Sequence, residues 1–333
     1  MSWTLRTCVT LILSLLVISF APAAGAGDDS PVFEATIADL QAMMETGEMS
    51  AEAITKAYLD RIERLNPELN AVIVTNPDAV AQARALDTER REGTVRGSLH
   101  GIPVLLKDNI ESRDRMATTA GSLALAENFT ERDAFFVGLL REAGAVILGQ
   151  TNLSEWANFR SERSSSGWSG VGGQTNNPYD PTRNPCGSSS GSGVAASASL
   201  AAVTVGTETN GSVVCPSTAN GVVGIKPTVG LVSRTGIVPI SHTQDTAGPM
   251  ARSVADAVIL LSAMLGWDKA DPVTDMAGVA AGWVLEDHRR NDGLEGKRIG
   301  VVRSLAGFHT EVDRLLDAAI ADLEAGGATI VDD

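Results

Sequence analysis

The sequence predicts an α/β protein in which a β-sheet is covered by α-helices. Short apolar segments typical of buried strands alternate along the chain with longer amphipathic segments typical of helices. Of the 333 residues, 44% are hydrophobic and 20% are charged. That composition is typical of a globular chain with a sizeable core and excludes a largely disordered one.

The N-terminal half of the chain shows this alternation clearly. Ser50 is placed to cap the second helix, and Asn66-Pro67 is expected to end it. A proline begins the third helix and Gly93 follows its end, which is the usual asymmetry of helix termini. The predicted helices cover residues 37–44, 51–65, 77–92 and 133–143, and the predicted strands cover residues 71–75, 102–106 and 145–148.

The C-terminal half continues the pattern after an irregular segment. Residues 164–192 have little hydrophobic periodicity and are rich in Gly, Ser, Asn and Pro. Beyond them, strands are predicted over residues 201–206, 222–226 and 298–302, with a strand onset at 329–331, and helices over 253–265 and 311–323. The sequence stops on a strand that a helix has just preceded. We therefore expect the chain to be incomplete at its C-terminus.

The first 26 residues have the pattern of a secretory signal peptide. Arg6 precedes an uncharged apolar stretch over residues 7–20, and small-x-small cleavage sites follow at residues 21–23 and 24–26. A membrane anchor is the alternative, but the apolar stretch is shorter than the ~20 residues that span a bilayer. We expect residues 1–26 to be cleaved, no stable membrane span to be left, and the protein to be exported to the periplasm or the extracellular space.

Charge and cysteine content exclude several classes of function. The formal net charge is −15, which opposes a basic nucleic-acid groove or a patch for anionic membranes. The three cysteines show no CxxC spacing, and no HExxH motif is present. These absences argue against a zinc ribbon and against metal-dependent hydrolysis, so neither a metal nor an organic cofactor is predicted.

The segment Pro185-Cys-Gly-Ser-Ser-Ser-Gly-Ser-Gly193 is the most informative one. A flexible linker is one interpretation, but the segment runs directly into VAASASLAAVTVG, an uncharged stretch suited to burial. A phosphate-binding glycine loop is another, but no apolar strand precedes the glycines and no P-loop lysine follows them. The composition favours a tight loop that passes through a core.

The segment Gly206-Thr-Glu-Thr-Asn-Gly-Ser212-Val-Val-Cys-Pro216 follows a predicted strand. Ser212 therefore lies in a loop beyond a strand end, where α/β enzymes carry their catalytic groups. Asn210 and Gly211 permit unusual backbone angles, so successive N–H groups could converge as an oxyanion hole requires. A serine in a glycine-containing loop is more often structural, so this segment alone would not identify a nucleophile.

The segment Leu99-His-Gly-Ile-Pro-Val-Leu-Leu-Lys107-Asp-Asn109 places a lysine directly after an apolar strand. A surface lysine that extends its amine into solvent is the ordinary interpretation. A partly desolvated amine is the alternative.

Taken together, these segments resemble the amidase signature family of serine hydrolases, and more its peptide-amidase branch than its tRNA-amidotransferase branch. The matching segments are residues 101–109 (GIPVLLKDN), 149–155 (GQTNLSE), 186–192 (CGSSSGS), 209–212 (TNGS) and 221–228 (GVVGIKPT). The resemblance implies a mixed central β-sheet covered by α-helices on both faces, in one domain over residues 32–333.

The resemblance also implies the roles of individual residues. Lys107 would be the general base, Ser188 the bridging serine that follows a cis peptide bond, and Ser212 the nucleophile. The N–H groups of Thr209, Asn210, Gly211 and Ser212 would form the oxyanion hole. The chain departs from the family pattern at Gln150, Cys186, Ser190, Glu208, Asn210 and Val214. These departures bear on substrate choice rather than on the chemistry, because they spare the lysine and both serines.

The chemistry requires an unusual lysine. A free serine needs a base within hydrogen-bond reach, and a lysine with an ordinary pKa of about 10.4 must lose roughly three pKa units to act as one near neutrality. That shift corresponds to about 4 kcal/mol in favour of the neutral form, which burial can supply. The apolar strand before Lys107 predicts such burial.

The predicted function is hydrolysis of carboxamide C–N bonds, with a small-molecule or peptide amide as the partner. Peptide C-terminal amides are preferred, and other small or fatty-acyl amides are the alternative. Competing hypotheses are a histidine base (His100, or His242 near Asp245), a thiol nucleophile (Cys186 or Cys215), an inactive fragment, and an amidotransferase subunit. The two cysteines could also form a disulfide in an oxidising compartment. The acidic charge and the export signal oppose a role on tRNA.

Overall fold

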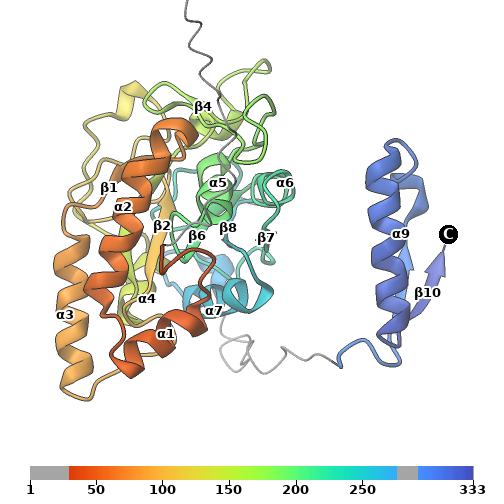
Figure 1. Cartoon of the computed structure of the whole chain (residues 1–333). Coiled ribbons are helices and arrows are strands. Elements are labelled where there is room, and N and C mark those ends of the chain that lie inside the picture. The colour runs from red at the N-terminus through yellow and green to blue at the C-terminus, as the bar shows by residue number, and fades with distance from the viewer. Residues whose placement is uncertain (1–29, 276–291, 333) are drawn as a thin grey trace, which may run out of the picture.

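A mixed six-stranded sheet lies at the centre of the computed structural model, which describes residues 30–275 and 292–332 (Figure 1). The strand order is β1-β3-β2-β6-β8-β7. The strands are β1 (Val72–Thr75), β2 (Pro103–Lys107), β3 (Val146–Thr151), β6 (Val203–Glu208), β7 (Val223–Gly224) and β8 (Thr246–Ala251). The predicted signal peptide, residues 1–26, lies outside the described residues.

Strand pairing brings the ends of β2 and β6 together. Strand β2 runs parallel to β3 and to β6, whereas the β1–β3, β6–β8 and β7–β8 pairs are antiparallel. Leu106 pairs with Val205, so Lys107 at the end of β2 lies beside the last residues of β6. Every residue of β2 and β6 is buried, as expected for central strands of a covered sheet.

Helices cover both faces of the sheet, as the sequence predicts. The α-helices are α1 (Ile37–Thr46), α2 (Ala51–Leu69), α3 (Ala79–Arg91), α4 (Phe135–Glu142), α5 (Ser190–Ser197), α6 (Val214–Ala219), α7 (Val254–Met264) and α9 (Thr310–Ala325). Short 3₁₀ turns cover Leu123–Leu125, Pro272–Thr274 and Arg303–Leu305, and a turn with left-handed backbone angles covers Glu155–Asn158. Helix α5 packs against β2, β3, β6 and β8, and only its small residues allow so close an approach (Figure 1).

The start of α2 is predicted correctly and its end is not. The Ser50 side chain accepts a hydrogen bond from the Ala53 N–H at 3.1 Å, so it caps the helix as expected. The helix continues through Pro67 to Leu69, however, instead of stopping at residue 66. A proline in the last turn removes only its own N–H donor. The helix ends at Asn70, which has a left-handed φ of 51° and donates its N–H to the Asn66 carbonyl.

Two other features differ from the predicted elements. The sequence gives no strand signal at residues 246–251, yet β8 lies between β6 and β7. Its sequence TAGPMA lacks alternation because the strand is buried throughout. Within the irregular segment 164–192, β4 (Trp168–Ser169) pairs with β5 (Gly173–Gln174), and α5 begins at Ser190.

The C-terminal residues form a strand–helix–strand unit, as predicted. Strand β9 (Arg298–Val301) pairs in parallel with β10 (Thr329–Asp332), and α9 connects them. Figure 1 shows this unit apart from the six-stranded sheet. None of the helices within residues 30–275 and 292–332 combines the length and the apolar character that crossing a membrane would need.

Candidate active site

Lys107 lies in the interior, at the carboxyl end of the central strand β2. Its side chain is 0% exposed. Its Nζ lies 2.8 Å from Ser188 Oγ and 3.0 Å from Ser189 Oγ. It also lies 2.9 Å from Thr207 Oγ1 and 3.2 Å from the Thr207 carbonyl oxygen. The amine is therefore surrounded by hydroxyl and carbonyl oxygens, and no carboxylate of the described residues forms an ion pair with it.

Burial changes the ionisation of this amine. Loss of water contact lowers the pKa of Lys107 from its ordinary 10.5 to about 7, although the negative charges of Glu208 and Asp245 oppose the shift. The size of the change matches what the chemistry requires of a base near neutral pH. The interpretation of Lys107 as a surface lysine is therefore wrong.

Ser188 is held in a tight loop that enters the core. The peptide bond between Gly187 and Ser188 is cis, as the resemblance implies. A Cβ at residue 187 would collide with the hydroxyls of Ser154 and Ser190, which would have to move to admit any residue other than glycine. Ser188 is fully buried and α5 begins two residues later. The loop is therefore part of the packed core and not a linker.

Ser189, the neighbour of Ser188, has a different environment. Its hydroxyl donates to the Thr207 carbonyl oxygen at 3.0 Å and accepts the Thr207 N–H at 3.2 Å. The Ser189 proton is thus committed to a backbone carbonyl. Ser188 also lies beside the Lys107 amine, but among the described residues its hydroxyl proton has no carbonyl acceptor.

Ser212 lies in the loop between β6 and α6, next to the Ser188 loop. Its carbonyl oxygen accepts the Ser189 N–H at 3.1 Å, which joins the two loops directly. The serine is 7% exposed, and its hydroxyl forms no hydrogen bond with any residue that the structure describes. Gly211, just before it, has a φ of 82°, a conformation that favours glycine. Asn210 needs no such conformation.

Glu208 shapes the Ser212 loop. Its carboxylate accepts N–H groups from Gly211 at 2.8 Å, from Val213 at 2.7 Å and from Val214 at 3.0 Å. The Gly211 N–H is therefore engaged by Glu208 and does not point freely at a substrate oxygen, which differs from its predicted role. The backbone N–H groups of the other three predicted oxyanion-hole residues, Thr209, Asn210 and Ser212, have no acceptor within the described chain.

Hydrogen bonds to Asp245 connect the Ser212 loop to the segment that follows β7. The Thr209 hydroxyl donates to Asp245 Oδ1 at 2.6 Å. The N–H groups of Ile240 and Ser241 donate to Asp245 Oδ2, each at 2.8 Å. The carboxylate is 8% exposed. Asp245 thus fixes residues 240–241 relative to the end of β6.

An apolar pocket of about 330 Å³ opens beside this site. Its lining residues are Asn109, Ala120, Trp156, Ala157, Phe159, Val238, Pro239 and Ile240. Main-chain hydrogen bonds connect the walls: Val238 donates to the Asn109 carbonyl, and Trp156 donates to the Ala120 carbonyl, both at 2.9 Å. Such a volume and lining are typical of a small-molecule site.

Asn109 connects the pocket to the amine. Its Nδ2 donates to Thr207 Oγ1 at 3.0 Å, and that oxygen also contacts Lys107 Nζ. Its Oδ1 is buried and has no hydrogen-bond partner among the residues described. An unpaired buried amide oxygen is costly unless a ligand or water supplies a donor. Among the described residues that line the pocket, it is the one buried side-chain polar atom without a hydrogen-bond partner.

The histidine hypothesis finds no support in this geometry. His100 is buried away from the serines, with its Nε2 3.0 Å from the Leu86 carbonyl oxygen. Asp245 directs its oxygens to Thr209 and to backbone N–H groups, and makes no hydrogen bond or ion pair with His242 in the described structure. His100 therefore has a local structural role, with one ring nitrogen near the Leu86 carbonyl and the other accepting the Arg96 N–H.

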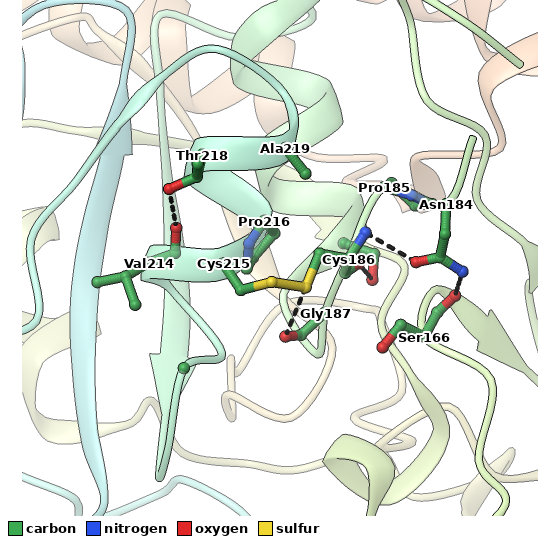
Figure 2. Close-up of a disulfide and its surroundings, with 12 residues drawn as sticks. Ser166, Asn184, Pro185, Cys186, Gly187, Val214, Cys215, Pro216, Thr218 and Ala219 are labelled. Carbon is green, nitrogen blue, oxygen red and sulfur yellow. Dashed lines mark hydrogen bonds between the residues drawn. A yellow bond between two sulfur atoms is a disulfide. The ribbon is translucent and has the colours of Figure 1, made fainter. Parts of the chain in front are cut away.

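The thiol hypothesis is wrong for the oxidised protein. Cys186 and Cys215 form a disulfide, with their Cα atoms 5.9 Å apart (Figure 2). Neither sulfur is then available as a nucleophile.

Sequence reasoning missed several residues of the site, namely Asn109, Ser189, Thr207 and Asp245, and it gave Glu208 no structural role. A signal existed for two of them. Thr207 and Glu208 end a buried strand, as Lys107 does, and parallel strands place such ends at the same edge of a sheet. Asp245 carried no such signal, because its role depends on the fold of residues 238–246.

Comparisons with known proteins find extensive similarity to amidases. The amidase family model matches residues 53–332. A probable amidase of Arabidopsis thaliana is 46% identical over 330 residues, which are 97% of this chain and 63% of that protein. The crystal structure of the peptide amidase from Stenotrophomonas maltophilia matches with a TM-score of 0.86 and 54% identity, over 91% of this chain and 62% of that one.

Some of the matching relatives carry a different name. A glutamyl-tRNA(Gln) amidotransferase subunit of Acidothermus cellulolyticus is 40% identical over 305 residues, which cover 86% of this chain and 57% of that protein. The chain therefore spans less than two thirds of the length of these relatives.

Proposed function

This chain belongs to the amidase family, and from that membership we propose that it hydrolyses the C–N bond of carboxamides. The observation that carries the proposal is the 2.8 Å contact between the buried Lys107 amine and the Ser188 hydroxyl. An amine with a pKa of about 7 that touches a serine hydroxyl has the protonation state and the reach of a general base.

The donors and acceptors around Lys107 determine the direction of proton transfer between Lys107 and the serines. A neutral amine offers two N–H donors and one lone pair. Ser189 Oγ and the Thr207 oxygens can accept the two N–H groups, because the Ser189 proton already points at the Thr207 carbonyl. The lone pair then faces Ser188, which passes its proton to Lys107 and takes the proton of Ser212.

The reaction proceeds in two stages, acylation of Ser212 and hydrolysis of the acyl ester. Ser212 Oγ attacks the amide carbon and its proton moves through Ser188 to Lys107. The same path returns that proton to the amide nitrogen, so the C–N bond breaks with ammonia or an amine as the leaving group. Water then attacks the acyl ester of Ser212, and its proton takes the same route. The products are a carboxylic acid and the regenerated hydroxyl.

The oxyanion of each tetrahedral intermediate needs hydrogen-bond donors. Within the described chain, the backbone N–H groups of Thr209, Asn210 and Ser212 have no acceptor, and they lie at the end of β6 around the proposed nucleophile. Preorganised donors of this kind stabilise developing charge more than water does. Gly211 joins this set only if its N–H leaves the Glu208 carboxylate.

The pocket supports a bulky acyl group as the bound part of the substrate. A leaving ammonia needs little more room than a water molecule, whose share of liquid volume is about 30 Å³. The pocket of about 330 Å³ is far larger and mostly apolar. It therefore suits the carbon-bearing side of the amide.

Asn109 favours a peptide amide over a fatty-acyl amide. A hydrocarbon chain in the pocket would leave the buried Asn109 Oδ1 without a donor, which is unfavourable by about 1–3 kcal/mol. An amino-acid residue presents a backbone N–H as well as an apolar side chain. We therefore assign the substrate class as N-acylated amino-acid or peptide C-terminal amides.

An amidotransferase subunit is the second candidate, since relatives carry that name. The net charge of −15 opposes contact with tRNA, which is itself polyanionic. A panel containing free glutamine, peptide amides and fatty-acyl amides separates the candidates, because the amidotransferase hypothesis predicts glutamine as the preferred amide donor.

We also propose that the protein is exported after cleavage of residues 1–26. The support is the charge and hydropathy pattern of these residues, together with the Cys186–Cys215 disulfide, which is typical of an oxidising compartment. N-terminal sequencing of the protein recovered from outside the cytosol tests this. An intact Met1 in that fraction would contradict it.

Substitution of the three residues tests the mechanism. Lys107→Ala, Ser188→Ala and Ser212→Ala should each lower kcat for a peptide amide by at least about 10³-fold, as loss of a triad member does. Ser189→Ala is the matched control, because it removes a neighbouring hydroxyl that has no proton to relay. Its kcat should fall far less. Wild-type rates in the first three variants would overturn the proposal.

A further inference from the structure

The Cys186–Cys215 disulfide joins the two loops that carry the proposed catalytic serines. Cys186 precedes the cis peptide bond and Ser188, and Cys215 lies in the first turn of α6, just after Ser212 (Figure 2). The covalent bond therefore connects two segments whose hydroxyls must meet for proton transfer.

A hydrogen bond joins the same loops on the other side of the serines. The Ser189 N–H donates to the Ser212 carbonyl at 3.1 Å. Residues 186–189 and 212–215 thus form a closed ring, with the disulfide at one end and this hydrogen bond at the other. Both serines are members of the ring.

Each half of the ring is also anchored to its surroundings. The Cys186 N–H donates to Asn184 Oδ1 at 2.8 Å, and the Ser190 hydroxyl donates to the Cys186 carbonyl at 2.6 Å. The Cys215 N–H donates to the Gly211 carbonyl at 2.8 Å. No direct hydrogen bond between the Ser188 and Ser212 side chains exists among the described residues. Their relative position is therefore set by the backbone, through the ring and through two contacts from outside it: Glu208 holds the Ser212 loop, and the Ser154 N–H donates to the Ser188 carbonyl at 3.0 Å.

We propose that Cys186 and Cys215 are positioning residues of the reaction: their disulfide holds Ser188 and Ser212 at the separation that proton transfer needs. This inference rests on the proposed function. Proton transfer requires heavy atoms about 2.6–3.2 Å apart, and a misplacement of about 1 Å costs on the order of 10² in rate. Opening the ring should therefore slow the chemical step.

Substrate binding should change little when the ring opens. The pocket walls come from residues 109, 120, 156, 157, 159 and 238–240, and none of these belongs to the ring. The disulfide is also accessible, because Cys215 is exposed and Cys186 is half-buried. A dithiol reductant can therefore transfer two electrons to the bond, leaving both cysteines as thiols while the reductant becomes a cyclic disulfide.

Steady-state kinetics on a peptide amide, before and after treatment with a dithiol, test the inference. We expect kcat to fall about tenfold or more on reduction, KM to stay within about twofold, and reoxidation to restore kcat. The Cys186→Ser/Cys215→Ser double variant should show the low kcat in either redox state. Circular dichroism at the assay temperature verifies that reduced and variant proteins are folded.

The possible outcomes separate the two hypotheses. If the oxidised protein hydrolyses no amide, the proposed function fails. If it hydrolyses amides and reduction leaves kcat unchanged while only the melting temperature falls, the disulfide is merely structural and the positioning role is overturned. Where the double variant does not fold, reduction and reoxidation of the wild-type protein decide the question.

Discussion

Glu208 accepts hydrogen bonds from the backbone N–H groups of the residues on both sides of Ser212. The carboxylate accepts the N–H before the serine, from Gly211 at 2.8 Å, and the N–H after it, from Val213 at 2.7 Å. The same charge also raises the pKa of Lys107, against the larger lowering effect of burial. One side chain thus shapes the loop of the proposed nucleophile and moderates the basicity of the proposed base.

Activity should depend on the ionisation of Lys107. Only the neutral amine can accept a proton, and the pKa of Lys107 is about 7. We therefore expect kcat/KM to be low below pH 6, to be half-maximal near pH 7 and to level off above pH 8. A pH–rate profile on a neutral peptide amide measures this. A profile that falls as pH rises through 7 would contradict a lysine base.

Removing the charge of Glu208 should move this profile. In Glu208→Gln, one negative charge that favours the protonated amine is lost, so the pKa of Lys107 falls and the acid limb moves to lower pH. At its plateau, kcat should fall about tenfold, since a neutral amide accepts the N–H groups of the Ser212 loop more weakly. Glu92→Gln, a change at an exposed helix end, is the control and should leave both quantities unchanged.

The buried lysine should reduce stability in acid. Its folded pKa of about 7 lies below the unfolded value of about 10.5, so the unfolded state binds more protons between these values and stability rises with pH there. Lys107→Met should therefore unfold with a free energy higher by on the order of 2 kcal/mol at pH 6, after allowing for lost hydrogen bonds. The gain should shrink towards pH 10. Urea denaturation at both pH values measures it, and a pH-independent difference would refute the assignment.

Asn109 should select substrates that carry an N–H donor. We expect N-acetylphenylalanine amide to have a kcat/KM about tenfold or more above that of its ester analogue, in which oxygen replaces the acetylated nitrogen. The reacting carboxamide is the same in both compounds. In Asn109→Ala the ratio of the two should approach one, whatever happens to the absolute rates.

A matched variant controls for general damage to the pocket. Phe159→Ala removes an apolar part of the same lining and should slow both compounds while preserving their ratio. Equal rates for the two compounds with the wild-type protein would show that Asn109 does not accept a hydrogen bond from the acetylated N–H of the substrate. The proposed amidase activity would stand in that case.

Most of the fold could be predicted because periodicity and helix caps are local signals. The strand that ends in Lys107 lies within one residue of its predicted range, and the helix capped by Ser50 starts at the predicted residue. Strand β8 could not be predicted, since a strand buried throughout has no alternation, and Gly248 and Pro249 suggest a turn. Helix α5 was missed because its glycines and serines are poor helix formers that only tight packing can accommodate.

The residues of the candidate site could be predicted only where they lie in a segment that matches a family motif. Lys107, Ser188 and Ser212 were found from matched segments, whereas the partners that orient them were not. Asn109 and Thr207 contribute through contacts between distant parts of the chain, which a single sequence does not reveal. Likewise, the pairing of Cys186 with Cys215 needed the two loops to be placed in space.

The positioning role proposed for the closed ring of residues 186–189 and 212–215 implies that folding and catalytic competence are two separate events. The sheet and its helices owe their packing to apolar burial, which needs no oxidant. On the proposal above, formation of the Cys186–Cys215 disulfide would then complete the alignment of the Ser188 and Ser212 hydroxyls. A newly synthesised chain in a reducing compartment would then be folded but would have a low kcat. It would gain full activity only on reaching an oxidising compartment.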